Sequence, residues 1–203
     1  MTIVILTASR MKKTIDGKEY SGKCVTGLDL DSNRVVRLVQ NKAGAPMENP
    51  FCNYYTPLNV YEMAFKETCP LKCQTENIIA DYEIPRLLGK YKYGIQDIYN
   101  RLAEIQKNDL KFIRDGYDKL SDISMYNHSL EIIKVADFQV KANKCSFTYN
   151  HTKYFSISLT DPDYVLPDGQ SKYIGDAYIA VSIPTDDYFG SYYKFVASVF
   201  PYT

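Results

Sequence analysis

Apolar and polar residues alternate along much of the chain, and this alternation predicts strands. The clearest example is residues 24–40, where two apolar runs rich in β-branched residues flank residues 31–33, Asp-Ser-Asn. Asp, Ser and Asn side chains can hydrogen-bond their own backbone and favour turns. The pattern therefore predicts a β-hairpin. A second hairpin is predicted at residues 145–159, with its turn at residues 150–152.

Short apolar or alternating runs predict the remaining strands. They are expected at residues 2–6, 58–65, 78–79, 130–135, 136–141, 178–183 and 192–200. Residues 7–13 are small and polar and then basic, so we expect them to form a loop that carries hydroxyls and cations.

Helical periodicity is confined to the middle of the chain. Residues 94–107 have apolar side chains at three- and four-residue spacing, with charges on the other faces. The pattern predicts an amphipathic helix there. A second, less regular helix is predicted over residues 109–119, where Gly116 weakens it.

Strands, a helical segment and strands again predict a mainly β (α+β) fold. Helices do not alternate with strands, so two antiparallel barrels fit better than an α/β sheet. The strand count per half matches small five-stranded Greek-key barrels of the OB type. We expect a first OB-like barrel at residues 1–86, a helical insert at 87–128 and a second OB-like barrel at 129–203.

The composition of the chain limits the kinds of partner that the protein could bind and the compartment in which it could work. The chain has 24 basic and 24 acidic side chains, so a polyanion site must be a local patch. There is no export signal or long apolar run, and the odd set of five cysteines suits a reducing compartment. We expect a cytoplasmic protein with no membrane contact. Nineteen tyrosines and no tryptophan fit either a β-rich fold or a binding face.

No pattern of a common enzyme is present. Phosphate-binding loops, dinucleotide fingerprints, zinc-protease helices and nucleophile elbows are all lacking. Cys52, Cys69 and Cys73 suggest part of a zinc site but lack a convincing fourth ligand. Asp161 and Asp163 could hold a divalent cation, although a turn whose carboxylates cap backbone amides fits better. We therefore expect no catalytic residues, metal or cofactor.

Cations and aromatic side chains instead suggest nucleic-acid binding, for which OB barrels are a usual platform. The alternative is that they are solvated strand charges and packing residues. Lys194 lies within an apolar run, so an inward position would require a carboxylate such as Asp161 or Asp163. The candidates are Ser9, Arg10, Lys12 and Lys13 in the first loop, Arg34 and Arg37 on the hairpin, and Tyr192, Tyr193 and Lys194 on the last strand.

Short motifs occur in order at residues 7–9, 22–27, 34–39, 145–149, 158–164, 181–183 and 193–197. Together they resemble the dual OB-containing domain family of bacterial proteins. The resemblance implies two OB-like barrels and a role in sensing or binding nucleic acid, often in defence against invading DNA.

The sequence thus suggests a non-enzymatic module that binds single-stranded DNA or RNA, in a setting of bacterial defence. One alternative is an interaction subunit whose tyrosine-rich surface docks a partner NTPase or nuclease. Another is a sensor of a nucleotide or a similar small anion.

Overall fold

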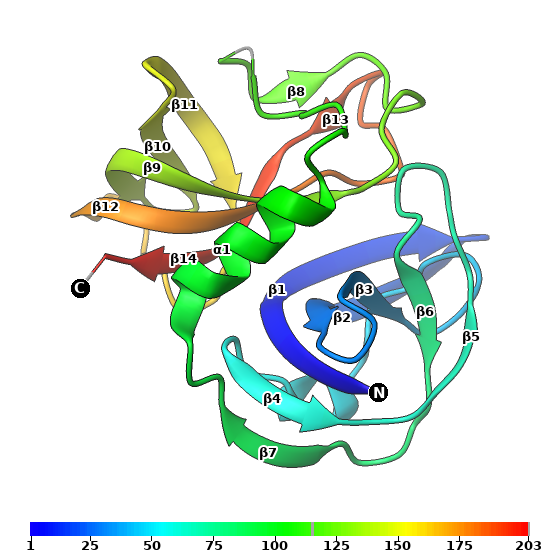
Figure 1. The fold of residues 1–203 in the computed structure, drawn as a ribbon. Coiled ribbons are helices and arrows are strands. Elements are labelled where there is room, and N and C mark those ends of the chain that lie inside the picture. The colour runs from blue at the N-terminus through cyan, green and yellow to red at the C-terminus, as the bar shows by residue number, and fades with distance from the viewer. Residues whose placement is uncertain (115, 203) are drawn as a thin grey trace. The chain divides into compact units, whose positions relative to one another are not determined.

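A computed structural model describes residues 1–114 and 116–202, and the chain divides into two compact units. The N-terminal unit is Met1–Lys107 and the C-terminal unit is Asn108–Thr203. Figure 1 shows that both units are built mainly of strands. The strand-rich fold with two OB-like units, expected from the sequence, is confirmed. The domain limits at residues 86 and 128 stay a prediction.

The N-terminal unit is one seven-stranded sheet with a helix after it in the chain. Its strands pair in the order β5-β6-β3-β2-β1-β4-β7. Its elements are β1 (Thr2–Ile15), β2 (Lys18–Asp29), β3 (Arg34–Val39), the 3₁₀ turn η1 (Phe51–Tyr54), β4 (Asn59–Glu62), β5 (Phe65–Thr68), β6 (Asn77–Ala80), β7 (Arg86–Lys90) and α1 (Gly94–Ile105).

The C-terminal unit contains a closed five-stranded barrel in the order β10-β11-β14-β12-β9, and β8 and β13 form a separate two-stranded sheet. Its strands are β8 (Lys119–Leu120), β9 (Leu130–Lys141), β10 (Lys144–Tyr149), β11 (Thr152–Leu159), β12 (Ser171–Ser182), β13 (Tyr192–Tyr193) and β14 (Phe195–Pro201).

The same order of pairing occurs in both units. In the C-terminal barrel the five strands β9, β10, β11, β12 and β14 pair so that the third and fifth, β11 and β14, are parallel. In the N-terminal unit β1, β2, β3, β4 and β6 occupy the same places, and β3 and β6 are again the parallel pair. Each unit is therefore an OB-type arrangement of five strands with local additions.

Each unit has its own apolar core. Alternating residues of β1, β2 and β3 meet Met47 and β6 in the N-terminal core, which includes Ile3, Ile5 and Val25. In the C-terminal barrel the rings of Phe138, Phe147 and Tyr154 stack in a row, with centroids 6.1 and 5.1 Å apart. Burial of large rings contributes strongly to core stability.

The two predicted hairpins and the first predicted helix are confirmed. β2 pairs with β3 and β10 pairs with β11, as expected for residues 24–40 and 145–159. The second hairpin turns at Asn150 and His151, both with positive φ, as in the tight turns that match strand twist. Helix α1 forms over Gly94–Ile105 and buries Ile98 and Leu102.

Two local predictions are wrong. Residues 7–13 form no loop, because β1 continues to Ile15 and pairs with β2 over its whole length. The helix predicted over 109–119 is absent among the described residues. The backbone N–H groups of Phe112 and Ile113 donate to the carboxylate of Glu131 instead of to helical carbonyls. A tertiary contact thus replaces the helical hydrogen bonds.

The strand predicted over 192–200 is interrupted at Lys194, which lies between β13 and β14. Conversely, the two strands predicted at 130–135 and 136–141 are one strand, β9. Among residues 1–114 and 116–202, no helix has the length and apolar character needed to cross a membrane.

Candidate nucleic-acid interface

The outer halves of β1 and β2 form a two-stranded ribbon that carries the clearest cluster of cations. The strands are joined by Asp16 and Gly17, with φ of 49° and 77°. An Asp-Gly turn with two positive φ angles favours a tight hairpin with fixed register. Counting back from this turn places Arg10 directly opposite Lys23, and Lys12 opposite Ser21.

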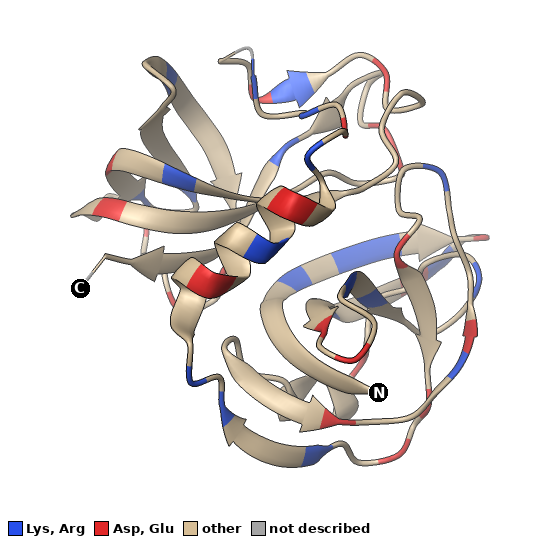
Figure 2. Cartoon of the chain, viewed as in Figure 1, with Lys and Arg blue, Asp and Glu red and all other residues tan. Residues whose placement is uncertain are grey.

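Directly opposed side chains lie on the same face of a ribbon, so Arg10, Lys12, Ser21 and Lys23 share one face. We call these four residues the basic ribbon. Figure 2 shows the basic positions of β1 in blue. Like charges placed directly opposite one another destabilise a strand pair. The Arg10–Lys23 pair therefore costs stability, which an anion bound between the two cations would offset.

An open pocket of about 410 Å³ is lined by residues of both faces at this end of the two strands. Gly22 allows a loop to approach closely, because a Cβ at this position would lie 2.0 Å from the carbonyl oxygen of Met47. The loop also supplies two asparagines to the lining of the pocket. The pocket is lined by Arg10, Met11, Lys12, Ser21, Gly22, Lys23, Asn49, Cys52 and Asn53.

The nearby acidic groups neutralise little of this charge. Lys12 lies 3.5 Å from Glu19, but both side chains are largely exposed, and such pairs contribute little. Lys13 lies on the other face of β1 and donates to the carbonyl of Ala43 at 2.8 Å. The face of Arg10 and Lys23 therefore keeps a local positive charge in a chain of zero net charge.

Three of the predicted candidates lie elsewhere in the N-terminal unit. Ser9 is buried in β1, not in an exposed loop. Arg34 is exposed but lies directly opposite Asp29, an acidic partner. Arg37 is 3% exposed. The structure thus brings Arg10 and Lys12 together but not the two hairpin arginines.

Arg37 belongs to a buried polar cluster. Its Nε lies 3.5 Å from a carboxylate oxygen of Glu76, and its Nη1 donates to the sulfur of Cys24. Burial disfavours the charged form, but Cys24, Glu76 and Cys73 outweigh it and raise the pKa of Arg37. Burial, aided by Glu76, raises the pKa of Cys73 to about 11. The cluster holds a charge inside the unit and offers no cation to the surface.

The three candidates near the end of the chain also differ in their environments. Tyr192 and Tyr193 form β13, pair with β8 and are half-buried. Lys194 is 1% exposed. Its Nζ donates to the carbonyl of Tyr117 at 2.9 Å and lies over the ring of Tyr154.

Asp161 makes contacts typical of a turn. Its carboxylate accepts hydrogen bonds from the backbone N–H of Asp163 and of Val199. Burial raises the pKa of Asp161, and the two N–H donors oppose this shift. Asp163 itself is exposed. No group of three or more His, Cys, Asp or Glu that could hold a metal occurs in the described part of the chain.

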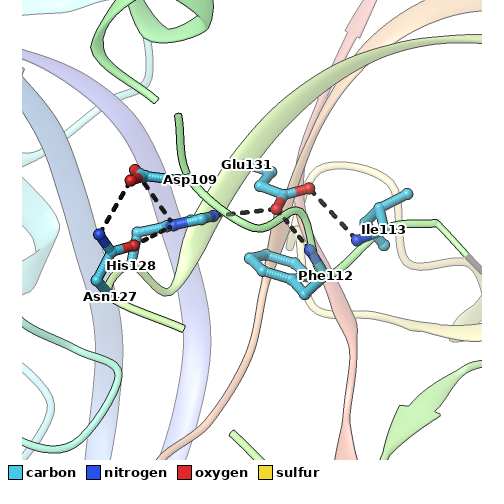
Figure 3. Close-up of polar contacts among 6 residues, drawn as sticks. All are labelled: Asp109, Phe112, Ile113, Asn127, His128 and Glu131. Carbon is cyan, nitrogen blue, oxygen red and sulfur yellow. Dashed lines mark hydrogen bonds and ion pairs between the residues drawn. The ribbon is translucent and has the colours of Figure 1, made fainter. Parts of the chain in front are cut away.

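A buried histidine cluster in the C-terminal unit was not predicted from the sequence (Figure 3). Nε2 of His128 lies 3.0 Å from Glu131, and Nδ1 lies 3.6 Å from Asp109. Glu131 also accepts the N–H groups of Phe112 and Ile113. These contacts fix the segment around Phe112 onto β9. The sequence offered no signal for the cluster beyond the three-residue spacing of His128 and Glu131.

Lys23, Ser21, Asn49 and Asn53 are the site residues that the sequence reasoning missed. The sequence signal for Lys23 was the Asp16-Gly17 turn. A two-residue turn fixes the register of the two strands, and this register places Lys23 directly opposite Arg10. The asparagines carried no comparable signal. They come from a loop far along the chain, and only its close approach at Gly22 brings them to the ribbon.

Comparisons with known proteins agree with this architecture. Neither the curated proteins nor the solved structures include a match to the chain. The model of the dual OB-containing domain family matches residues 1–199. The match covers both units, each of which shows the OB order of strand pairing. The chain therefore belongs to the dual OB-containing domain family.

Proposed function

We propose that the protein is a non-enzymatic module that binds single-stranded nucleic acid through the basic ribbon. The observation that carries this proposal is the directly opposed pair Arg10 and Lys23 beside an open pocket. The turn between the first two strands is also a common oligonucleotide-binding element of OB barrels. Family membership supports a nucleic-acid role in general terms.

The chemistry of the ribbon suits a phosphodiester backbone. Arg10 can donate two parallel hydrogen bonds to one phosphate, and Lys12 and Lys23 supply point charges beside it. Ser21, Asn49 and Asn53 provide further polar groups at the pocket.

An aromatic face lies on the same two strands. Tyr20 is opposite Lys13 and therefore lies on the other face of the two strands from the basic ribbon, and the Nζ of Lys18 lies 4.7 Å from the centroid of the Tyr20 ring. Aromatic faces next to cations favour unpaired bases, because a base must be exposed before it can stack. Because this ring faces away from the basic ribbon, the expected preference for a single strand rests on the OB-type arrangement of the unit and not on Tyr20.

The test is fluorescence anisotropy of labelled single-stranded DNA, single-stranded RNA and duplex DNA across a salt series. We expect the Arg10→Gln/Lys23→Gln variant to bind single strands more weakly. Loss of two phosphate contacts should reduce the slope of log K against log salt by about 1.4, at about 0.7 per contact.

A matched control is Lys42→Gln/Arg86→Gln, which removes two exposed cations of the same unit that pair with Glu67 and Glu62. This control should bind as the wild type does. Absence of wild-type binding at low salt, or an equal loss in the control, would contradict the proposal. Arg37 is a poor target for this test, because its burial makes any substitution a test of folding.

A second candidate function is docking of a partner protein. The turn enclosed by the Tyr188–Ser191 bridge favours this function. Phe189 is 89% exposed, has a positive φ, and its ring centroid lies 4.5 Å from that of Tyr188. A bulky residue in this conformation is unusual, and exposed aromatic side chains are frequent anchors of interfaces. Asp186 and Asp187 precede this turn. They suggest a partner with an apolar pocket and a basic rim.

The family resemblance suggests a nuclease or NTPase of a defence system as this partner. Pull-down from nuclease-treated extract with wild-type and Phe189→Ser baits tests the idea. A stoichiometric partner that is retained by the wild type and lost by Phe189→Ser would support it. Equal recovery by both baits would reject this turn as the docking point.

A further inference from the structure

The C-terminal barrel repeats the most unusual feature of the basic ribbon. Lys141 ends β9, Lys144 begins β10, and the two lysines lie directly opposite each other across a two-residue turn. Both side chains are exposed. β9 and β10 are the first and second strands of the C-terminal barrel, as β1 and β2 are of the N-terminal sheet. The like-charged pair thus occupies the same pair of strands in each unit.

These two pairs stand out from every other charged pair in the sheets. Where two charged residues are directly opposed elsewhere, their signs differ, as in Asp29–Arg34 and Glu62–Arg86. Among the directly opposed positions of the described strands, like charges occur only at Arg10–Lys23 and Lys141–Lys144. Both pairs are cationic. In a chain of zero net charge, this placement is not explained by a general excess of lysine.

The surroundings of Lys141 and Lys144 suit a phosphodiester strand. Lys141 is also directly opposite Ser171 of β12, so a third strand joins this face. Tyr173, two residues further along β12, is 63% exposed. Strand alternation places Tyr173 on the same side as Ser171. Cations beside an exposed aromatic ring are the combination that single strands require.

Neither Lys141 nor Lys144 forms an ion pair with another described residue. Lys144 donates to the hydroxyl of Ser158 at 2.8 Å, and Lys172 lies over the ring of Tyr164. Asp168 is in the loop 166–170, whose backbone hydrogen-bonds that of Ala142. The hydroxyl of Tyr173 donates to Asp137 at 3.3 Å. This bond orients the Tyr173 ring and leaves Lys141 and Lys144 without direct neutralisation by Asp137.

We infer that Lys141 and Lys144 form a second binding site for the phosphodiester backbone, so that both units of one chain bind the same strand. The inference rests on the proposed function for the nature of the ligand, and adds a site and a binding mode. Once one unit holds a strand, the second site meets the strand at a high effective concentration. Long strands should therefore bind more tightly than short ones.

The test compares Lys141→Gln/Lys144→Gln with the wild type and with the Arg10→Gln/Lys23→Gln variant, on DNA and RNA oligomers. A short oligomer of roughly 8 nucleotides lies within the site size of one OB fold, and one of roughly 30 can span two. We expect two short oligomers to bind per wild-type chain and one per chain of either variant. Each variant should bind the long strand at least about 10-fold more weakly than the wild type.

The lysines are exposed, so the variant should fold, and Lys141→Arg/Lys144→Arg should retain binding of the long strand. The control Lys134→Gln/Lys153→Gln removes two other cations of the C-terminal unit and should bind as the wild type does. If Lys141→Gln/Lys144→Gln binds both oligomers as the wild type does while the Arg10→Gln/Lys23→Gln variant is weakened, the second site is wrong and the proposed function stands. If the wild type binds no oligomer, both are wrong.

Discussion

The two units share one order of strand pairing, but only the sheet of the C-terminal unit closes into a barrel. In the C-terminal unit the fourth and fifth strands, β12 and β14, pair over six positions and close the barrel. In the N-terminal unit the corresponding β4 and β6 are not neighbours, and each pairs with an added edge strand, β7 or β5. Closure abolishes edges, whereas an open sheet must protect them. Charged residues on β5 and β7 serve this purpose, among them Lys66, Glu67, Arg86 and Lys90.

The units also differ in how they neutralise buried charge. In the N-terminal unit, Arg37 of β3 lies against Glu76, the residue just before β6. The C-terminal unit neutralises Glu131 with two backbone N–H groups and His128. One arrangement depends on a second side chain of opposite charge, and the other depends mainly on a segment of backbone. The two should therefore respond differently to substitution.

The largest expected difference is between the hydrogen-exchange rates of the closed C-terminal barrel and those of the edge strands of the N-terminal sheet. Amides of β14 lie inside a closed barrel, whereas all four residues of β5 are exposed at an edge. We expect β14 to exchange at least about 10³-fold more slowly than β5 or β7, because edge strands open locally without global unfolding. Exchange monitored by mass spectrometry measures this. Equal protection would mean that the edges of the N-terminal sheet are covered in solution.

The next largest effect is expected for Arg37→Ala. Removing one partner of a buried ion pair leaves the other charge uncompensated, which costs about 3–5 kcal/mol of unfolding free energy. Urea denaturation gives the value. The double variant Arg37→Met/Glu76→Leu replaces both charges with apolar side chains and should recover most of the loss. A loss below about 1 kcal/mol for the single variant would show that the pair contributes little.

A smaller effect is expected for Glu131→Gln. The amide keeps the shape and one acceptor oxygen, but its NH₂ cannot accept the second backbone N–H. Losing charge-assisted hydrogen bonds should cost about 1.5–3 kcal/mol by urea denaturation. Glu104→Gln, on the exposed side of α1, is the control and should stay within about 0.5 kcal/mol of the wild type. A loss as large as that of Arg37→Ala would mean that the backbone contacts are not the main partners of Glu131.

The local sequence pattern was sufficient to predict much of the fold. Both predicted hairpins and α1 followed from alternation, turn chemistry and helical spacing, which act over a few residues. The helix expected over 109–119 failed because its N–H groups bind Glu131, a contact that no local pattern reveals. The loop expected over 7–13 is wrong because the tight turn at Asp16-Gly17 joins β1 and β2 in a hairpin that includes these residues.

The candidate site was only partly predictable for the same reason. Arg10 and Lys12 were found by composition, and Lys23 needed the register of the ribbon. Arg34 and Arg37 were both candidates, because a strand with charges on both faces does not reveal which face is buried. The asparagines of the pocket depend on the approach of a loop to Gly22, which only the tertiary fold sets.

All five cysteines are buried, and this makes the protein a convenient target for selective labelling. Burial raises the pKa of the Cys52, Cys69, Cys73 and Cys145 thiols, which slows their reaction with alkylating reagents. Thr14 is exposed and lies on the same face as Lys12. A Thr14→Cys substitution would therefore carry a maleimide dye beside the basic ribbon without removal of any native cysteine.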